Sequence, residues 1–581
     1  MLSWRRFLVV GAMETFCLVP GLLAQATIQE QLAAIAPDQT TDVIVRYKPG
    51  VDDLGRSRIV GRAIRHNHDL WLLRSHAVTI KGSDLAALAA DPDVEAVLPD
   101  HDVAITTTNI VPDYGWLTVL GLNSPSATFP YDGTGIGVAV IDSGINDSDD
   151  LKDASGHTRI VYKQSLVPND PNTDDHYGHG MHVAGIIGGN GHKSLGNPNF
   201  TYGIRGIAPN VQLISLRVLD STGAGKDSTV IAAIQTAISL QKKYNIRVIN
   251  LSLGRPVFES YTVDPLCQAV EQAWKAGIVV VVAAGNDGRD NSVGTNGYAT
   301  ITAPGNDPLV ITVGAMNTNG TLSRSDDKVA SYSSKGPTLI DHITKPDLVA
   351  PGNRILSLQD NGQYLQKTFP GNSVPRYVYT SGTDSSSPDY YQLSGTSMAT
   401  PMVSGTVALM FQKTPSLTPD QVKARLMKTA QKLPFISTYA VDPVTFTLYT
   451  SENDLFTIGA GYLDAQAALA NTDLASAPAT SPAVTADGHG GVFLVTGTGA
   501  VWGTGAVWGT GAVWGTNAVW GTNAVWGTGA VWGTNAVWGT NAVWGTGAVW
   551  GTGAVWGTGA VWGTTTTTTA EALSLIINGE Q

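Results

Sequence analysis

The chain has almost no cysteine. Two cysteines, Cys17 and Cys267, occur among 581 residues. Cys17 falls in a stretch that we expect to be removed, so Cys267 would have no partner and the mature chain no internal disulfide. A chain of this length can bury enough surface to fold without one. Cys267 lies at helical spacing in an apolar segment, which predicts a small buried side chain and not a nucleophile.

Charge is also scarce, and positive charge is the scarcer sign. Charged residues make up 14% of the sequence, and the net charge at pH 7 is −12. A nucleic-acid partner needs a basic face, so this balance argues against one. After the N-terminal stretch no run reaches the roughly 18 apolar residues of a spanning helix, which predicts a protein that does not cross a membrane.

The first 26 residues resemble a secretory signal peptide in composition. Arg5 and Arg6 are followed by an apolar run over 7–23 and then by Ala24-Gln25-Ala26. A basic start, an apolar middle and an A-x-A end are typical of export signals. Glu14 interrupts the apolar run, which weakens the match and also argues against a membrane anchor. We expect a secreted protein, extracellular or periplasmic.

The pattern from 110 to 472 is strand, loop, helix, repeated. Apolar runs occur at 138–141, 214–218, 248–251 and 278–284, and helical patterns at 228–243 and 265–276. Such runs suit strands that are buried on both faces. The alternation predicts an α/β domain with a doubly wound, mostly parallel sheet. In such sheets the site lies outside the carboxyl ends of the strands.

The regions on either side of this domain differ from it in composition. Strand-like runs at 42–47 and 94–99 flank a capped helical pattern at 83–90, which predicts a small α+β unit. Near the other end, eleven copies of Gly/Asn-Ala-Val-Trp-Gly-Thr carry eleven of the fifteen tryptophans. An even period would place every Trp on one face of an extended chain. Both a β-solenoid with an aromatic ladder and a low-complexity tail remain open. The expected divisions are 1–26 signal peptide, 27–109 α+β unit, 110–472 α/β domain, 473–498 linker, 499–564 repeat and 565–581 tail.

Ser397 is the first candidate catalytic residue. Gly395 allows a sharp turn before it, and residues 398–413 read as a buried helix behind it. The serine would then lie at a helix N-terminus, where negative charge is favoured. Pro401 is expected in the first turn of that helix. A capping Ser/Thr cluster is the alternative interpretation if no partners exist elsewhere.

Two partners do exist upstream. Asp142 ends the apolar run 138–141, and His179 opens a helical pattern. A serine hydroxyl becomes a nucleophile when a base takes its proton, and that base needs an acid to orient it. Asp142, His179 and Ser397 are therefore candidates for these three roles.

The segments 140–144, 179–185 and 395–401, in this order, resemble the motifs of subtilisin-family (subtilase) serine peptidases. The resemblance covers about 110–472. It implies Asp142 as orienting acid, His179 as general base and then acid, and Ser397 as nucleophile. Residues 281–286 resemble the oxyanion segment of the family, which implies Asn286 as the amide donor to the tetrahedral intermediate. Alone, Asn286 would more simply satisfy a turn.

The resemblance also implies a substrate cleft. Small side chains in two segments would leave room for a sizeable apolar residue before the scissile bond, and a third segment would pair with the substrate backbone as an added strand. Glycine-rich turns of purely structural role are the alternative. The residues concerned are Ser252, Leu253, Gly254, Ala283, Ala284 and Gly285 for the pocket, and Gly223, Ala224 and Gly225 for the pairing edge.

Some positions depart from the family pattern. Met181 and Arg255 stand where smaller or hydroxyl side chains are usual, and we expect activity to survive both. His182 is interpreted as a packing residue. The segment 359–391 looks inserted just before the serine, where it could shape or cover the cleft.

A calcium site is a further expectation from the family, because subtilases often bind structural calcium. Asn190, Asn197 and Asn199 would offer neutral oxygens on the loop after the histidine helix. A plain polar loop is the alternative, and the metal ligands stay unknown. No cofactor is expected for the chemistry.

The family pattern implies a self-processing precursor. Residues 42–106 resemble an inhibitory propeptide, with cleavage expected between about 105 and 110. The main hypothesis is thus a secreted serine endopeptidase that acts on proteins or peptides. The alternatives are an inactive subtilase-fold binding protein, an acyl transferase or esterase with the same triad, and a surface-attached adhesive protein whose tryptophan repeat binds a cell-surface or glycan partner.

Overall fold

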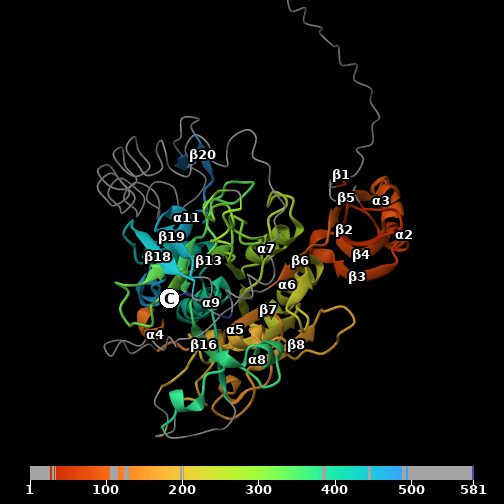
Figure 1. The fold of residues 1–581 in the computed structure, drawn as a ribbon. Coiled ribbons are helices and arrows are strands. Elements are labelled where there is room, and N and C mark those ends of the chain that lie inside the picture. The colour runs from red at the N-terminus through yellow and green to blue at the C-terminus, as the bar shows by residue number, and fades with distance from the viewer. Residues whose placement is uncertain are drawn as a thin grey trace, which may run out of the picture. The chain divides into compact units, whose positions relative to one another are not determined.

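The computed structural model describes residues 27–28, 32, 35–104, 116–122, 130–195, 199, 202–292, 294–381, 388–442, 446–486, 492–494, 577 and 579–580. They fall into two compact units, a smaller one with the residues up to 67 and 74–99, and a larger one with 68–73 and everything from 100 onward (Figure 1). The expected signal peptide, the tryptophan repeat and the expected cleavage region at 105–110 lie outside the described residues.

The smaller unit is an α+β fold, as its strand and helix patterns predict. Its five-stranded sheet has the order β1-β5-β2-β4-β3. The core lies between the sheet and the helices and is made of side chains such as Val43, Val45, Leu85, Leu88 and Val97. The elements are β1 (Thr27–Ile28), β2 (Thr40–Tyr47), α2 (Asp53–Val60), β3 (Arg65–Leu70), β4 (Ser75–Lys81), α3 (Gly82–Ala89) and β5 (Val94–Pro99).

An eight-stranded sheet forms the centre of the larger unit, with the order β14-β13-β12-β11-β7-β9-β8 and with β15 also paired to β13. Neighbouring strands are parallel except β13 and β14. The apolar runs of the sequence therefore do form a mostly parallel sheet. The strands are β7 (Gly137–Asp142), β8 (Ile160–Ser165), β9 (Gln212–Arg217), β11 (Ile246–Leu251), β12 (Val279–Ala283), β13 (Ile311–Asn317), β14 (Lys328–Val329) and β15 (Leu348–Pro351).

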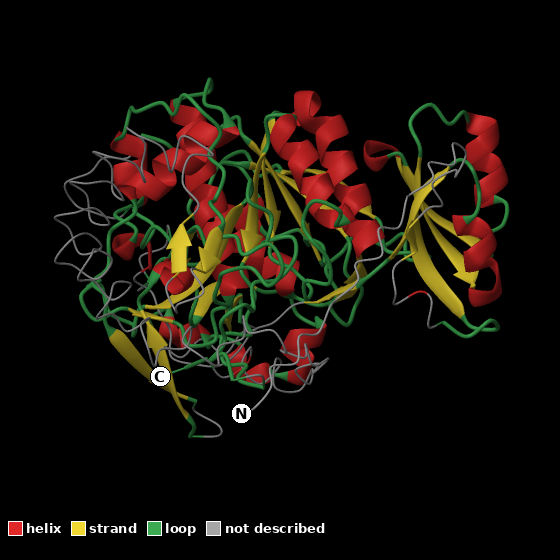
Figure 2. Cartoon of the chain, turned by 90° about the horizontal axis from the view of Figure 1, so that it is seen from above, coloured by secondary structure: helices red, strands yellow, loops and turns green. Residues whose placement is uncertain are grey.

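Two pairs of helices pack on this sheet (Figure 2). Helix α5 (His179–Gly188) contacts α9 (Thr396–Lys413), and α6 (Asp227–Tyr244) contacts α7 (Pro265–Lys275). Every residue of β7 and β12 is buried, so both faces of the sheet are covered. The other elements of the unit are η1 (Trp71–Leu73), β6 (Asp102–Ala104), α4 (Trp116–Val119), η2 (Asp149–Leu151), β10 (Ala224–Lys226), β16 (Ile355–Leu358), α8 (Tyr364–Thr368), η3 (Pro370–Asn372), η4 (Arg376–Val378), β17 (Tyr390–Leu393), α10 (Pro419–Thr429), β18 (Ser437–Val441), β19 (Leu448–Glu452), α11 (Leu455–Ile458), α12 (Ala465–Ala470), β20 (Val484–Ala486) and β21 (Val492–Leu494).

Strand order explains where a site can form. β7 lies between β9 and β11, so the chain first builds the sheet on one side of β7 and then crosses to the other. Such a switch of direction opens a crevice at the carboxyl ends of the strands. Asp142 ends β7 at this edge, and Ser252 directly follows β11.

The helix behind the serine begins earlier than the sequence pattern predicts. Gly395, with φ of 144°, is the residue before the helix, so Ser397 is its second residue. Pro401 is therefore the sixth residue and lies inside the helix, which corrects its expected place in the first turn. Proline has no N–H for the carbonyl four residues before it, here that of Ser397. The hydroxyl of Ser252 donates to that carbonyl instead, at 2.8 Å.

Candidate active site

Asp142 and His179 form a buried pair. The histidine Nδ1 lies 2.8 and 3.0 Å from the two carboxylate oxygens of Asp142, and both side chains are fully buried. The backbone N–H of Ser143 also donates to Asp142, at 2.7 Å. A carboxylate on Nδ1 fixes the tautomer that leaves Nε2 as a proton acceptor. Among the described residues, Nε2 of His179 has no hydrogen-bond partner.

A second carboxylate, Asp175, holds the start of the histidine helix. It accepts hydrogen bonds from the backbone N–H groups of Tyr177, Gly178 and Met181 at 2.7–3.0 Å. Its other contact, with the hydroxyl of Ser143 at 2.9 Å, ties the helix to the residue that follows Asp142. Burial raises the pKa of Asp175, while these N–H groups act in the opposite direction. The relative position of Asp142 and His179 is therefore fixed by several bonds.

Ser397 lies in the first turn of α9, and α9 packs against the histidine helix. Its hydroxyl donates to the carbonyl of Ser252 at 3.0 Å. Two hydrogen bonds thus join Ser397 to Ser252 at the end of β11. The Ser252 hydroxyl donates to the Ser397 carbonyl, and the Ser397 hydroxyl donates to the Ser252 carbonyl. No bond between Ser397 and His179 is formed in this arrangement, which is a common state of such pairs before substrate binds.

Asn286 follows β12 and is oriented by Thr396. The side-chain oxygen of Asn286 accepts from the N–H of Thr396 at 2.8 Å and from its hydroxyl at 3.0 Å. With that oxygen engaged, the NH₂ end of the amide is directed away from Thr396 and is the end that can donate to an oxyanion. Thr396 is the residue immediately before Ser397, so the turn that holds the Asn286 side chain also carries Ser397.

The expected substrate edge carries a strand of the same chain. β10 pairs antiparallel with β6, with Ala224 opposite Ala104 and Gly225 opposite Val103. Gly223 precedes this strand. The edge segment thus pairs with residues 102–104 of the same chain, and its pairing with a substrate stays a prediction.

The two expected pocket segments lie at the ends of neighbouring parallel strands. One follows β11 and the other ends and follows β12, and β11 pairs with β12. Four of these residues are buried, and Gly254 and Gly285 are partly buried. The residues are Ser252, Leu253 and Gly254 in one segment and Ala283, Ala284 and Gly285 in the other.

The departures from the family pattern have local explanations. Arg255 is buried and pairs with Asp227 and Asp264 at 2.9 Å each, and these carboxylates raise its pKa against the effect of burial. Met181 is buried in the histidine helix. Burial lowers the pKa of His182 to about 3, and its Nε2 lies 3.1 Å from two backbone carbonyls, as expected of a packing residue.

The inserted segment 359–391 contacts the loop that leads into His179. It leaves β16 and returns in β17, which pair antiparallel. The N–H groups of Tyr364 and Leu365 donate to the carbonyls of His176 and Tyr177, and the Gln363 amide donates to the carbonyl of Asp175. Within the described residues the insertion thus supports the entry to the histidine helix.

The loop expected to bind calcium is held by protein groups. The Asn190 amide donates to the Lys152 carbonyl at 2.8 Å, and its oxygen accepts from the N–H of His192. Both ends of the Asn190 side-chain amide are therefore engaged by protein groups. Asn199 is exposed and Asn197 lies outside the described residues, so calcium binding stays a prediction.

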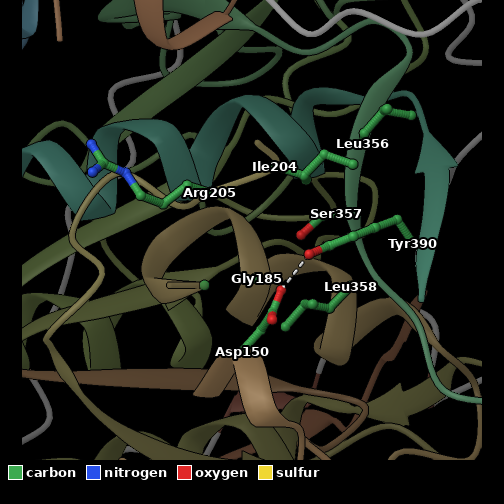
Figure 3. A pocket seen from close by; sticks show the side chains of 9 residues that line it. Asp150, Gly185, Ile204, Arg205, Leu356, Ser357, Leu358 and Tyr390 are labelled. Atoms are coloured by element: carbon green, nitrogen blue, oxygen red, sulfur yellow. Dashed lines mark hydrogen bonds between the residues drawn. The ribbon is translucent and has the colours of Figure 1, made fainter. Parts of the chain in front are cut away.

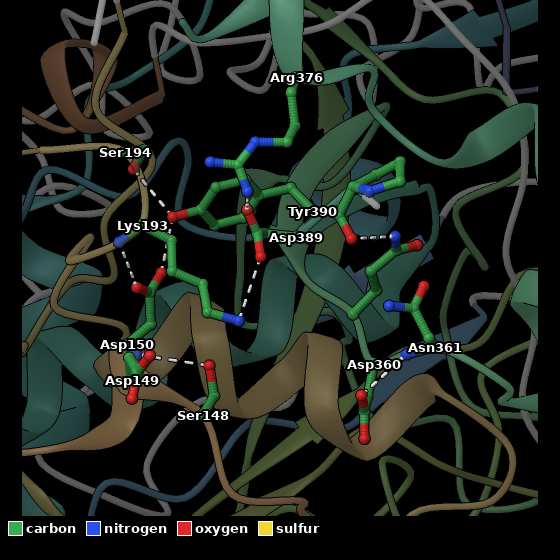
Figure 4. A network of polar contacts seen from close by, with 12 residues as sticks. Ser148, Asp149, Asp150, Lys193, Ser194, Asp360, Asn361, Arg376, Asp389 and Tyr390 are labelled. Carbon is green, nitrogen blue, oxygen red and sulfur yellow. Dashed lines mark hydrogen bonds and ion pairs between the residues drawn. The ribbon is translucent and has the colours of Figure 1, made fainter. Parts of the chain in front are cut away.

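Asp150, Arg205, Ser357 and Tyr390 are among the residues that line a pocket next to this loop (Figure 3). Asp150 there accepts from the Tyr390 hydroxyl at 2.6 Å and from the N–H of Lys193 at 2.7 Å. The Lys193 ammonium lies 3.1 Å from Asp389, which also pairs with Arg376 at 2.8 Å (Figure 4). Burial raises the pKa of Asp150. Within the described ranges, no three His, Cys, Asp or Glu side chains are grouped so as to hold a metal ion.

Sequence reasoning missed Asp175 and Thr396. Asp175 stands four residues before the start of the helix, ahead of the N-cap position at Gly178, and its contact with Ser143 is long-range, so no local pattern marks it. Thr396 reads as an ordinary member of the serine motif. Cys267 is buried, as predicted, and its thiol donates to Asn306 at 3.2 Å.

A carboxylate, an imidazole and a serine at one edge of a parallel sheet are the parts that serine hydrolases use. Residues 133–461 match the model of the Subtilase family. Serine protease AprX of Bacillus subtilis is 38% identical over 305 residues, which are 52% of this chain and 62% of AprX. Subtilisin E of the same species is 36% identical over 360 residues, 61% of this chain and 75% of that protein.

Among solved structures, fervidolysin from Fervidobacterium pennivorans, a keratinolytic enzyme related to subtilisin, is similar with a TM-score of 0.55. The match covers 77% of this chain and 63% of fervidolysin at 23% identity, so it shows the fold. The family match spans more than half of the chain, which therefore belongs to the subtilase family of subtilisin-like serine peptidases. It spans less than two thirds of the length of AprX.

Proposed function

We propose that this chain is the precursor of a secreted serine endopeptidase. The observation that carries the proposal is the buried Asp142–His179 pair. Nε2 of His179 has no partner among the described residues, and the histidine helix packs against the helix that contains Ser397. Family membership supports peptide bonds as the substrate. No helix among the described residues is long and apolar enough to cross a membrane.

The proposed reaction follows from these positions. Ser397 Oγ turns from Ser252 to His179, gives its proton to Nε2 and attacks the peptide carbonyl carbon. Asp142 stabilises the imidazolium, and the Asn286 amide donates to the new oxyanion. The C–N bond then breaks as the imidazolium returns the proton to the leaving amine. Water hydrolyses the acyl-enzyme by the same steps, with His179 as base and then acid.

We also propose that residues 27–109 are an inhibitory propeptide that the enzyme removes itself. β6 lies on the edge strand where a substrate backbone would pair, a few residues before the expected cut. A strand left in that place occupies the non-primed side of the cleft as a cleavage product would.

The test compares secreted wild-type protein with the Ser397→Ala variant. The wild type should hydrolyse an unfolded protein and begin between about residues 105 and 110, and the variant should do neither. An active enzyme whose first residue is near 27 would contradict the proposed self-processing but not the triad. A Ser397→Ala variant that still hydrolyses the protein would contradict the triad. A matched pair of ester and amide substrates separates a peptidase from an esterase.

Two further parts of the proposal are independent of the triad. The chemistry needs no cofactor, so EDTA should leave turnover unchanged; faster thermal inactivation in EDTA would reveal a structural calcium ion. The tryptophan repeat is proposed to bind a cell-surface or glycan partner, and a chain from which only the repeat, residues 499–564, is deleted should keep its peptidase activity while surface retention falls.

A further inference from the structure

Residues beyond the tryptophan repeat are buried in the larger unit. Ile577 is 5% exposed, and Glu580 is 1% exposed. A carboxylate so deeply buried needs partners, because leaving it unpaired away from water is costly. The partners of these residues belong to separate segments of the same unit and are Arg289, Ser331, Asn353 and Asn372.

The Glu580 carboxylate binds a charged cradle. Its Oε2 accepts from the backbone N–H of Ser331 at 2.9 Å, from the Ser331 hydroxyl, and from the Arg289 guanidinium at 3.2 Å. Arg289 is itself fixed by Asp442 at 2.6 Å, by the Ser331 hydroxyl and by the ring of Tyr449. The cradle therefore offers a positive charge and N–H and O–H donors to a single carboxylate.

The backbone of the same segment is recognised as well. The Asn353 amide donates to the carbonyl of Glu580 at 3.1 Å, and its oxygen accepts from the N–H of Glu580 at 3.3 Å. The Asn372 amide donates to the carbonyl of Ile577 at 3.4 Å. Gly579 has φ of +58°, and a Cβ there would lie 3.1 Å from atoms of Asn353, Arg354 and Ser394. Backbone pairs, a glycine and a carboxylate together make this a sequence-selective contact.

The cradle is adjacent to the turn that carries the serine. The Ser394 hydroxyl accepts from the N–H of Arg354 at 2.8 Å, and the N–H of Gly395 donates to the carbonyl of Gly352. The segment that contains Gly579 packs against Ser394, three residues before Ser397. Its docking therefore braces the two chain segments that meet at the serine turn.

We propose that Arg289, Ser331 and Asn353 form an intramolecular peptide site whose ligand is the chain's own C-terminal part, bound through Gly579 and Glu580. On the other side of the repeat, the backbone N–H of Ser481 donates to the Pro308 carbonyl. The backbone N–H of Thr344 donates to the Pro482 carbonyl, within the same unit. The repeat is thus joined to the catalytic unit at both flanks. A chain cut within the intervening residues keeps its distal part bound without a covalent link.

The experiment uses the full chain with Ser397→Ala and a recognition sequence for a site-specific protease inserted between residues 496 and 497. After cutting, the distal fragment should co-elute with the rest of the chain. The Glu580→Ala fragment should dissociate at least tenfold faster, with Glu580→Gln between the two. Glu271→Ala, in the part of the chain before the cut, removes a surface pair with Lys275 and is the matched control. The distal fragment should dissociate from this variant at the same rate as from the unmodified chain.

Hydrogen exchange on the uncut chain gives a second measurement that needs no dissociation. The N–H of Ser331 donates to Glu580, so its exchange should be at least tenfold faster in Glu580→Ala and unchanged in Glu271→Ala. The proposed site would be overturned if the wild-type and Glu580→Ala fragments dissociated at the same rate. It would also be overturned if the exchange rate of the Ser331 N–H were the same in both chains.

Discussion

Nδ1 of His179 lies within 3.0 Å of both oxygens of Asp142, whereas the Ser397 hydroxyl donates to the Ser252 carbonyl and not to the histidine. The acid–base pair is also held by the bonds of Asp175, while the serine and Asn286 depend on Thr396 and on one short turn. The first half of the site is complete before any substrate binds. In the second half the Ser397 hydroxyl still donates to the Ser252 carbonyl.

This difference indicates where each kind of substitution should act. Residues around Asp142 and His179 are held by buried polar bonds, so changing them should affect stability as well as turnover. Ser397 and Asn286 contact the reacting atoms in the proposed reaction, so substitutions there should act mainly on turnover. Thr396 and Ser397 are also buried and hydrogen-bonded, so some loss of stability is expected as well.

The largest effect should come from removing either half completely. Ser397→Ala and His179→Ala are each expected to lower kcat by roughly 10⁶-fold, and the double variant should be no worse than either, because the two groups act as one unit. Turnover of a chromogenic peptide by mature enzyme measures this, with circular dichroism as the folding control. Multiplicative losses in the double variant would show that the halves work independently.

A smaller effect is expected at the oxyanion donor. Asn286→Ala should lower kcat by about 10²–10³-fold with little change in KM. Thr396→Val removes one of the two bonds to the Asn286 oxygen and keeps the N–H bond, so a loss of about fivefold, roughly 1 kcal/mol, is expected. If the two variants changed KM in place of kcat, Asn286 would bind ground-state substrate only.

The support of the histidine helix is expected to contribute to stability. Asp175→Asn places an NH₂ group against backbone donors, which should lower the free energy of unfolding by about 1–3 kcal/mol. Urea unfolding in the Ser397→Ala background, where self-cleavage is absent, gives the value. Asp153→Asn is the control, since that carboxylate accepts from two N–H groups at an exposed turn and should cost less than 1 kcal/mol by roughly the same scale.

The smallest predicted effect concerns pH. The pKa of His182 is lowered to about 3 in the folded chain, whereas the unfolded histidine titrates near about 6.5. As pH falls through that window the unfolded chain binds the proton and the folded chain does not, so stability is lost as pH decreases. His182 alone should remove about 1 kcal/mol between roughly pH 6.5 and 5.5. Urea unfolding of wild type and His182→Gln, both with Ser397→Ala, should differ by this amount; equal slopes would contradict a neutral buried imidazole.

The sheet and the main helices could be predicted because each gives a pattern of apolar residues within its own stretch of sequence. The apolar runs at β7, β9, β11 and β12 and the helical patterns at α6 and α7 agree with the structure to within a few residues. The place of Pro401 could not be predicted, because its missing hydrogen bond is replaced by Ser252, more than a hundred residues away in the sequence.

The candidate site shows the same limit. Asp142, His179 and Ser397 are visible in motifs, and the structure places the acid and base in contact. The Thr396 bonds to Asn286 and the Glu580 cradle join distant segments by one or two polar atoms, which leave no periodic pattern in the chain. The repeat and the expected signal peptide lie outside the described residues and stay predictions.

Reaction with a fluorophosphonate, followed by mass spectrometry of the labelled peptide, tests the triad most directly. Mature wild-type enzyme should carry the label on Ser397, Ser397→Ala should carry none, and His179→Ala should react far more slowly. Label on another residue, or on Ser397 at an undiminished rate in His179→Ala, would contradict the account.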